Sequence, residues 1–211
     1  MDNARRRSKQ LMAARFRRRR ELHKQAEAQT QMVEAKDVIS LINKLESVEL
    51  KLMLALCRFG GLRQDEASSI TWESIYFEDK LMFIHPSKNR KRLRLCPLFA
   101  DLASLIAPYA ATGRVQRLWE PGSPAPRILL KKECERLGFK LWPRTFYSLR
   151  MSRIDELLAA FPCDDVMIWL DIPDASNVRL HYLNKHCAHY LDKSFSESIV
   201  KAAGYSVTES M

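Results

Sequence analysis

An arginine that directly follows a helix stop is the first residue with evident chemistry. Arg63 comes after Gly60-Gly61-Leu62, and Glu66 lies three residues later. At the entrance of a helix the Arg63 guanidinium can reach an anion, and the Glu66 carboxylate can hold that guanidinium by hydrogen bonding. Taken alone, the segment also fits an ordinary surface arginine paired with an i, i+3 carboxylate.

Two later segments add a second cation and a hydroxyl. Arg150 follows the apolar Leu149 in a segment with helical spacing, which predicts a position at the edge of the core, facing a cleft. Tyr182 stands between His181 and Leu183 near the end of the helical region. A structural ion pair for Arg150 and a core position for Tyr182 are the ordinary alternatives.

The elements that must position these residues follow from hydrophobic spacing. Short runs rich in Ile, Phe and Tyr predict a small antiparallel meander over 72–77, 81–85 and 92–96, with the basic loop 86–91 between its last two strands. Apolar residues at helical spacing predict helices over 38–45, 50–59, 102–109, 128–136, 144–160, 164–170, 175–184 and 194–203. The predicted fold class is α+β, mainly α, with one three-stranded antiparallel sheet.

Taken together, these segments resemble the catalytic domain of the tyrosine recombinase, or phage integrase, family. The shared order is Gly61-Leu62-Arg63-x-x-Glu66, a hairpin lysine at Lys88, Leu149-Arg150 on a helix, and then Tyr182. The segments between these motifs agree as well. Residues 70–75 resemble the family's segment that leads into the first strand, and residues 94–98 resemble the segment in which its last strand ends and a helix begins. The resemblance spans residues 35–192 and implies the helical fold of that domain.

The resemblance implies that the chain breaks and rejoins DNA. In the family, the tyrosine hydroxyl attacks a phosphodiester to form a 3′-phosphotyrosine, and a 5′-hydroxyl of a partner strand reverses the step. Arg63 and Arg150 would clamp the nonbridging oxygens, Lys88 would protonate the leaving 5′ oxygen, and Tyr182 would be the nucleophile. Lys91 and Tyr190 are the reserve candidates for the lysine and the nucleophile.

The resemblance implies no metal and no nucleotide cofactor. His186, Cys187 and His189 lie close together in the sequence, but no spacing partner completes a tetrahedral set.

Two auxiliary positions depart from the family pattern. Tyr147 stands where the family usually has His or Lys, three residues before the second arginine, and Leu170-Asp171-Ile172 replaces a typical Leu-Gly-His. Each lost group is worth ~10²-fold or more in rate. One alternative is therefore a catalytically impaired, DNA-binding remnant of an integrase. A further alternative sets the resemblance aside: the chain would then be a helical protein with a basic arm that binds RNA or acts as a scaffold.

The charge of the chain is concentrated at its N-terminus. The 211 residues carry a formal +10, of which residues 1–25 contribute +8. We expect a basic helical or disordered arm over 1–34, the catalytic-domain-like unit over 35–192, a C-terminal helix or tail over 193–211, and no separate N-terminal core-binding domain. Double-stranded DNA is the expected partner, with candidate phosphate contacts at Arg17, Arg18, Arg19, Arg20, Arg90, Lys91 and Arg153.

Composition also bears on where in the cell the protein is found. No apolar stretch reaches the length of a membrane span or a signal-peptide core, and the five cysteines form no C-x-x-C pair. These features predict a cytoplasmic protein with reduced thiols and no membrane or small-molecule partner. A bacterial or mobile-element origin, association with the nucleoid, and a tetramer on paired DNA sites are expected by family analogy alone.

Overall fold

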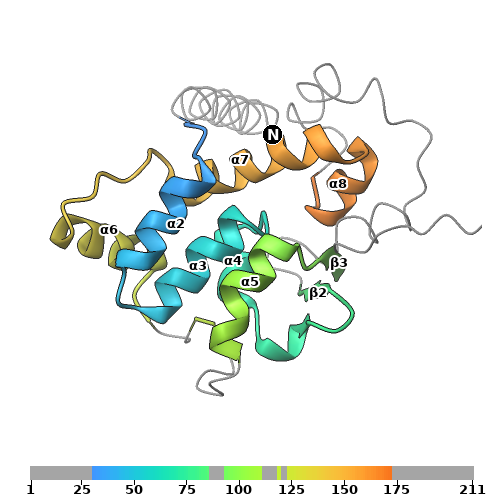
Figure 1. Cartoon of the computed structure of the whole chain (residues 1–211), viewed down its shortest axis with the longest axis horizontal. Coiled ribbons are helices and arrows are strands. Elements are labelled where there is room, and N and C mark those ends of the chain that lie inside the picture. Colours follow the sequence, from blue (N-terminus) through green and yellow to red (C-terminus); the bar gives the residue numbers. More distant parts are fainter. Residues whose placement is uncertain (1–29, 86–92, 111–117, 120–122, 173–211) are drawn as a thin grey trace, which may run out of the picture.

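The computed structural model describes residues 30–85, 93–110, 118–119 and 123–172. Within them, the predicted α+β fold with a small antiparallel sheet is confirmed (Figure 1). The predicted helices over 175–184 and 194–203 lie outside the described residues. The described helices are α2 (Ala35–Lys44), α3 (Val48–Arg58), α4 (Gln64–Ser69), α5 (Ala100–Ala110), α6 (Pro126–Arg136), α7 (Thr145–Ala160) and α8 (Cys163–Trp169).

Helix α3 forms the centre of the domain. Its first turn is capped by the Ser47 hydroxyl, which accepts a hydrogen bond from the Leu50 N–H at 3.2 Å. Nearly all of its residues are buried, and it contacts α2, α4, α5, α6 and α7. A helix that is buried over most of its circumference must be enclosed by other elements, so α3 sets the positions of the helices around it.

The sheet consists of β1 (Ile75–Tyr76), β2 (Leu81–Ile84) and β3 (Arg94–Pro97) in the order β1-β2-β3, with antiparallel pairing throughout. Met82 pairs with Cys96, and Ile84 pairs with Arg94. Because side chains on a strand alternate between faces, these four residues share the face that packs against the core.

The first predicted strand is shorter than expected. Residues Trp72–Ser74 form a 3₁₀ helix, and only Ile75–Tyr76 are extended. The Ser74 hydroxyl accepts a hydrogen bond from the Thr71 N–H at 3.3 Å and lies 2.8 Å from the Thr71 hydroxyl. These local hydrogen bonds offer the backbone an alternative to the sheet ladder, which explains the turn.

Helix α7 links the core to the far end of the domain. It packs along α3 and against α8, and α8 also contacts β3, as the arrangement in Figure 1 shows. Segments that are distant in the sequence, namely the start of α4, strand β3 and the end of α8, are thereby brought together.

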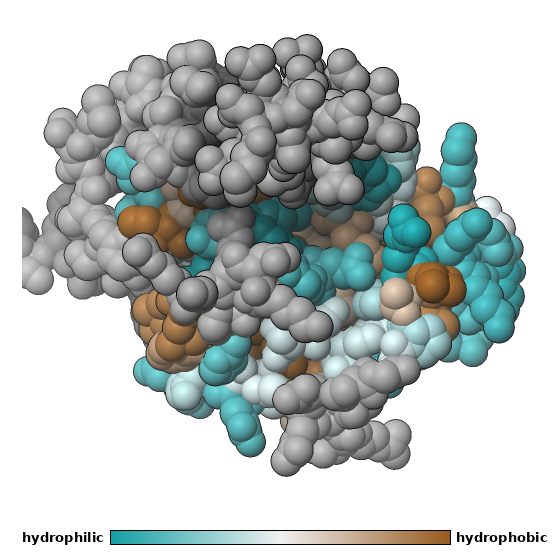
Figure 2. All heavy atoms as spheres, turned by 180° about the vertical axis from the view of Figure 1, so that it is seen from behind, coloured by the Kyte–Doolittle hydropathy of each residue, from teal (hydrophilic) through white to brown (hydrophobic). Residues whose placement is uncertain are grey.

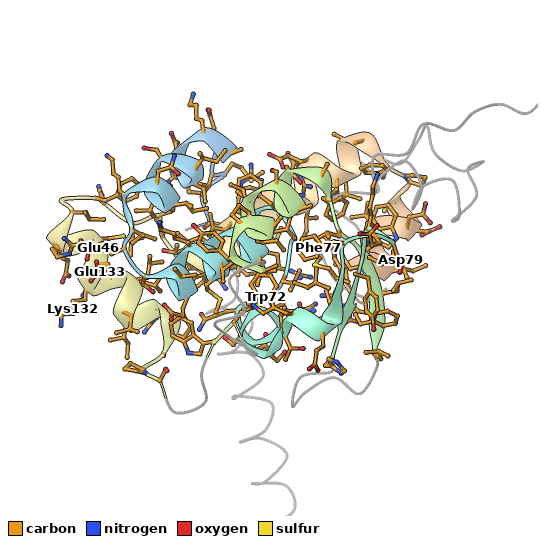
Figure 3. The ribbon with its side chains drawn as sticks, turned by 60° about the horizontal axis from the view of Figure 1, so that its bottom comes forward. Glu46, Trp72, Phe77, Asp79, Lys132 and Glu133 are labelled. Carbon is orange, nitrogen blue, oxygen red and sulfur yellow. The ribbon has the colours of Figure 1, made fainter. Side chains whose placement is uncertain are left out.

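The periphery is held by weaker contacts. At the end of the domain formed by α6, Arg136 pairs with Glu46 at 3.0 Å and with Glu133 at 2.9 Å, and Figure 3 shows the two carboxylates close together. Exposed pairs of this kind contribute little to stability. On the face seen in Figure 2, apolar side chains of the described residues reach the surface in separate groups between polar ones.

The described cysteines, Cys57, Cys96, Cys134 and Cys163, are all buried and free, as the sequence predicted. Among the described residues, no helix is long and apolar enough to cross a membrane.

Candidate functional site

Arg63 occupies the entrance of α4, as its place after the glycine pair predicted. The Glu66 carboxylate accepts hydrogen bonds from the Arg63 backbone N–H at 2.8 Å and from Nη1 of its guanidinium at 2.7 Å. The first contact is half of a capping box, in which the third helical residue reaches back to the residue before the helix. The predicted contact between the two side chains is therefore present.

Arg150 lies deeper than its sequence context predicted. We expected it at the edge of the core, but its side chain is only 6% exposed. Its Nη1 donates to the Gly61 carbonyl at 2.5 Å, and its Nη2 donates to the Leu170 carbonyl at 2.5 Å. Gly61 has a φ of +65°, a backbone conformation that favours glycine, and this turn presents its carbonyl to Arg150.

Arg94, which was not among the site residues predicted from the sequence, is the third arginine at this point. Its side chain is 8% exposed, and its Nη2 donates to the Glu66 Oε2 at 2.8 Å. Strand alternation was the available signal, because Arg94 must share the inward face of β3 with the buried Cys96.

The end of α8 has an unusual turn residue. Asp171 has a φ of +49°, its N–H donates to the Ile168 carbonyl at 3.2 Å, and the Ile172 N–H donates to the Met167 carbonyl at 2.9 Å. This pair of hydrogen bonds is the Schellman motif, whose left-handed position is usually glycine and sometimes a residue with a short polar side chain. Asp171 therefore takes the position of the glycine in the Leu-Gly-His of the resembled family.

The turn leaves three successive carbonyls for other partners, and the three arginines use one each. Such carbonyls at a helix C-terminus carry partial negative charge and attract cations. Arg94 donates to the Trp169 carbonyl, Arg150 to the Leu170 carbonyl at 2.5 Å, and Arg63 to the Asp171 carbonyl at 2.7 Å. We call Arg63, Arg94 and Arg150, with Glu66, the arginine cluster.

Glu66 is the shared counter-ion of the cluster. Burial alone would raise its pKa, but the positive charges of Arg94, Arg150 and Arg63 outweigh burial and hold the pKa of Glu66 below its usual value. Burial, together with the charges of Arg63 and Arg94, lowers the pKa of Arg150 to about 9, against the opposing effect of Glu66. Glu66 and Arg150 are therefore both charged near neutral pH, and the three guanidinium groups share one buried carboxylate.

Asp171 adds a second carboxylate at the solvent-exposed edge of the arginine cluster. Its Oδ2 lies 3.4 Å from Arg63 Nη1, and both side chains are partly exposed, Arg63 to 23%. Arg63 is thus the member of the cluster that solvent reaches most easily. With the two carboxylates counted, the three guanidinium groups still exceed the negative side chains by one charge, a balance that suits a monoanion such as a phosphodiester.

Arg153, expected to contact DNA, is not part of the cluster. Its guanidinium pairs with Asp101 at 2.9 Å and Glu156 at 3.3 Å, and lies over the ring of Phe99 with 4.6 Å to the centroid. The contact with DNA stays a prediction for this residue.

Tyr147 occupies the first of the two auxiliary positions that depart from the family pattern, and its ring lies beneath a cation. The guanidinium of Arg144 stands over its ring, 4.0 Å from the centroid. Arg144 itself precedes α7 in a left-handed conformation, with a φ of +46°.

Several predicted site residues lie outside the described residues, and their roles stay predictions. They are Lys88 and Tyr182, the reserve candidates Lys91 and Tyr190, and the expected DNA contacts Arg17, Arg18, Arg19, Arg20 and Arg90.

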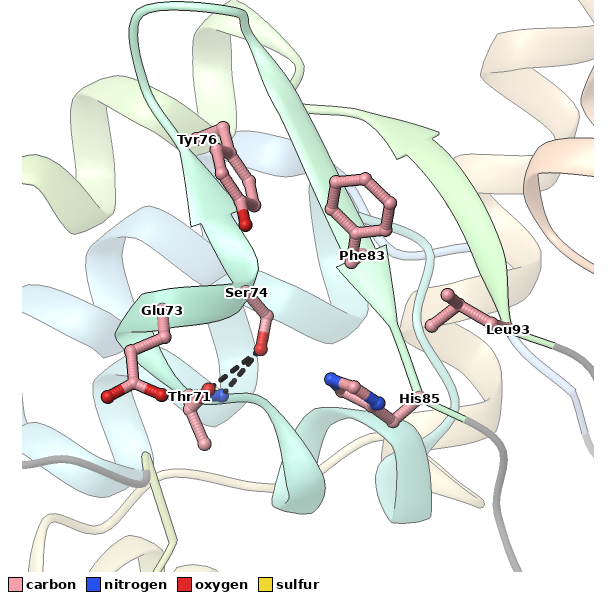
Figure 4. Close-up of a pocket in the computed structure, with 7 residues that line it drawn as sticks. All are labelled: Thr71, Glu73, Ser74, Tyr76, Phe83, His85 and Leu93. Carbon is pink, nitrogen blue, oxygen red and sulfur yellow. Dashed lines mark hydrogen bonds between the residues drawn. The ribbon is translucent and has the colours of Figure 1, made fainter.

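A surface pocket of about 370 Å³ lies on the other face of the sheet (Figure 4). Phe83 and Tyr76 contribute an edge-to-face aromatic pair to its wall, with ring centroids 5.2 Å apart. Since Leu93 lines this pocket and the next residue, Arg94, points to the core, the pocket does not open onto the arginine cluster. Among the described residues, no group of three His, Cys, Asp or Glu side chains is placed to hold a metal ion.

Comparisons with solved structures show which proteins share this fold. The XerH site-specific recombinase bound to palindromic difH substrate, in a post-cleavage complex, has a TM-score of 0.53 and 17% identity over 75% of this chain and 50% of that one. The XerA recombinase has a TM-score of 0.54 and 11% identity over 81% and 64%. The pre-cleavage complex of XerH with difH has a TM-score of 0.52 and 20% identity over 72% and 49%.

The chain thus spans roughly half to two thirds of the length of these recombinases. No curated protein sequence matches it significantly. Residues 25–137, more than half of the chain, match the Phage integrase family. That range includes Arg63, Lys88 and Arg94 but not Arg150 or Tyr182. The chain therefore belongs to the phage integrase family, as its sequence motifs predicted.

Proposed function

We propose that the chain is a site-specific DNA recombinase that breaks and rejoins DNA through a 3′-phosphotyrosine intermediate. The observation that carries this proposal is the meeting of Arg63 and Arg150 at one carboxylate, Glu66, and at the end of α8. Membership of the phage integrase family and the Xer-like fold support it. The XerH site-specific recombinase was solved in complexes with difH substrate, which supports double-stranded DNA as the partner proposed here.

The proposed chemistry is a transesterification. The Tyr182 hydroxyl attacks the phosphorus and gives its proton to solvent, an O–P bond forms to the tyrosine, and the O–P bond to the 5′ oxygen breaks. Lys88 gives a proton to that leaving oxygen. Arg63 and Arg150 hold the nonbridging oxygens, where negative charge grows in the transition state.

The arginine cluster is suited to this task by its charge. In the structure its guanidinium groups reach the carbonyls at the end of α8, which carry only partial negative charge. A phosphodiester offers a full negative charge and two oxygens, so it is a better partner for guanidinium groups than a carbonyl is.

The domain organisation belongs to the same proposal. Residues 35–192 would form the catalytic unit, residues 1–34 a basic arm that contacts phosphates, and residues 193–211 a C-terminal tail. By analogy with the family, the chain would act on paired sites as a tetramer, in the cytoplasm, in association with a bacterial chromosome or a mobile element.

The test is capture of a covalent adduct between protein and DNA. Duplexes with a nick close to a randomised segment lose the short cleaved strand by diffusion, so a phosphotyrosine intermediate accumulates and can be recovered on a denaturing gel and sequenced. We expect adducts with the natural chain and with Tyr76→Phe, a control at an exposed position of strand β1. We expect none with Tyr182→Phe.

Loss of the adduct in Tyr190→Phe but not in Tyr182→Phe would move the nucleophile to Tyr190. Replacing Arg63 by Gln should lower the rate of adduct formation ~10²-fold or more, because a clamp on the developing charge is removed. An unchanged rate in this variant would contradict the role of the cluster.

A second candidate function is a DNA-binding remnant without strand cleavage. The Asp171 carboxylate beside Arg63 and the cation-bound ring of Tyr147 favour it. Tyr147 stands where the resembled family has a group that assists catalysis, and Asp171 places a negative charge beside a predicted clamp arginine. Duplex binding by the natural chain without any adduct in the randomised pool would select this function.

A further inference from the structure

Arg94 joins three elements that are far apart in the sequence. It begins strand β3, its Nη2 donates to Glu66 in α4 at 2.8 Å, and its Nη1 donates to the Trp169 carbonyl at the end of α8. The side chain is nearly buried. A guanidinium is planar and rigid, so two hydrogen bonds from one group fix the distance and the angle between its two partners.

Both partners of Arg94 also hold the predicted clamp arginines. Glu66 uses Oε1 for Arg63 Nη1 at 2.7 Å, and its Oε2 lies 3.6 Å from Arg150 Nη1. The end of α8 supplies the carbonyls of Leu170 and Asp171 to the same two arginines. Any movement of Glu66 or of the end of α8 is therefore passed to both clamps.

We propose that Arg94 is a positioning residue for strand cleavage, which locks Glu66 to the end of α8 and so holds the guanidinium groups of Arg63 and Arg150 on one phosphate. This inference rests on the proposed function, because it concerns the rate of the same reaction. Arg94 itself does not need to touch the DNA.

The charges around Glu66 supply a signature that a purely structural role would not produce. Arg94 makes the largest contribution among the charges that keep Glu66 ionised, followed by Arg150 and Arg63. Asp65 precedes Glu66 on the same helix, and Cys57 lies on the adjoining helix α3. Without Arg94, burial raises the pKa of Glu66, so the carboxylate takes up a proton at a higher pH and its hold on Arg63 weakens.

Arg58 is a matched control. It is also buried, and its guanidinium also combines a carboxylate, Glu156, with a backbone carbonyl, that of Val33. It belongs to α3 and has no contact with Glu66 among its hydrogen bonds and ion pairs in the described residues. Replacing Arg58 by Met therefore removes an equivalent buried arginine without touching the arginine cluster.

The experiment measures the rate of adduct formation on a nicked duplex recovered from the randomised pool, under saturating protein and after the folded fraction is checked by circular dichroism. We expect Arg94→Met to lower the rate ~10²-fold, the usual cost of misplacing catalytic groups by about 1 Å, with a much smaller change in DNA affinity. Arg58→Met should stay within about threefold of the natural chain.

Two further measurements separate positioning from stability. The rate of adduct formation by Arg94→Met should fall as the pH is lowered from neutral. The pH dependence of the rate for Arg58→Met should follow that of the natural chain. In a Glu66→Gln background the added Arg94→Met change should cost less than about threefold, because the residue through which Arg94 acts is already altered. If Arg94→Met does not fold, Arg94→Lys is compared with Arg58→Lys in the same way. Lysine keeps the positive charge but cannot donate two hydrogen bonds from a planar guanidinium.

Equal rates in the Arg94 and Arg58 variants would overturn the inference and leave the proposed function intact. Full additivity of Arg94→Met and Glu66→Gln would also overturn it. Absence of any adduct with the natural chain would overturn the proposed function and the inference together, and it would be recognised before any variant is compared.

Discussion

The carboxylate of Asp171 should oppose the binding of a phosphate at Arg63. Asp171→Asn is the sharpest perturbation, because asparagine keeps the shape of the side chain and tolerates the left-handed backbone at the end of α8, where φ is +49°. Only the charge beside Arg63 Nη1, now 3.4 Å away, is removed.

The size of the effect follows from Coulomb's law. A phosphate bound to Arg63 would stand about 5 Å from Asp171, and an effective dielectric constant of about 20 to 80 gives a repulsion of about 1–3 kcal/mol. Both side chains are partly exposed, so solvent screening favours the lower half of that range. We therefore expect duplex DNA to bind Asp171→Asn about 5- to 25-fold more tightly than the natural chain, at a difference of tenfold per 1.4 kcal/mol.

The assay is fluorescence anisotropy of a labelled duplex at several salt concentrations. Asp164→Asn is the control, because Asp164 is exposed in the first turn of the same helix and its replacement changes the net charge equally. The gain in DNA affinity of Asp171→Asn should become smaller as salt is added, since screening weakens the repulsion between Asp171 and the phosphate. Equal gains in the two variants would refute the reasoning, because they would show a response to net charge rather than to the arginine cluster.

Three other predictions concern stability and the arm. Because the folded pKa of Glu66 is lowered, its stabilising effect is present above its ordinary pKa and is lost as the pH falls through the folded value; Glu66→Gln should cost about 3–5 kcal/mol in urea unfolding at pH 7 and flatten that acid dependence. Gly61→Ala should lower the thermal midpoint at a cost of about 1–3 kcal/mol, because its φ is +65° and the added Cβ would lie 3.0 Å from Leu170; a midpoint equal to that of the natural chain would contradict this. Deleting residues 1–25 should flatten the salt dependence of duplex binding by about 0.9 for each phosphate that the arm neutralises, and an unchanged slope would show that the arm neutralises none.

The arrangement of the elements was largely readable from periodicity. Helices α2, α3, α6, α7 and α8 lie within a few residues of the predicted ranges, because apolar residues at helical spacing are strong local signals. The first strand was overestimated, since the hydrogen bonds of Thr71 and Ser74 favour a turn that an apolar pattern does not register.

The candidate site was readable in part. The contact of Arg63 with Glu66 follows from their spacing, because residues three apart on a helix are neighbours. Arg94 was missed, although its alternation with Cys96 pointed inward, since a charged residue in a short strand is normally taken as exposed.

The sequence motifs predicted the family by resemblance, which the family match over residues 25–137 confirms. Hydrophobic spacing predicted the mainly helical fold, and residue spacing predicted the pairing of Arg63 with Glu66, because both depend on neighbours in the chain. The tertiary structure alone decided that Arg150 is buried, that Arg94 joins it at Glu66, and that the three arginines meet three successive carbonyls at the end of α8. These contacts join α4, β3, α7 and α8, and their hydrogen bonds depend on distances and angles that only the packing of α7 and α8 around α3 and β3 creates.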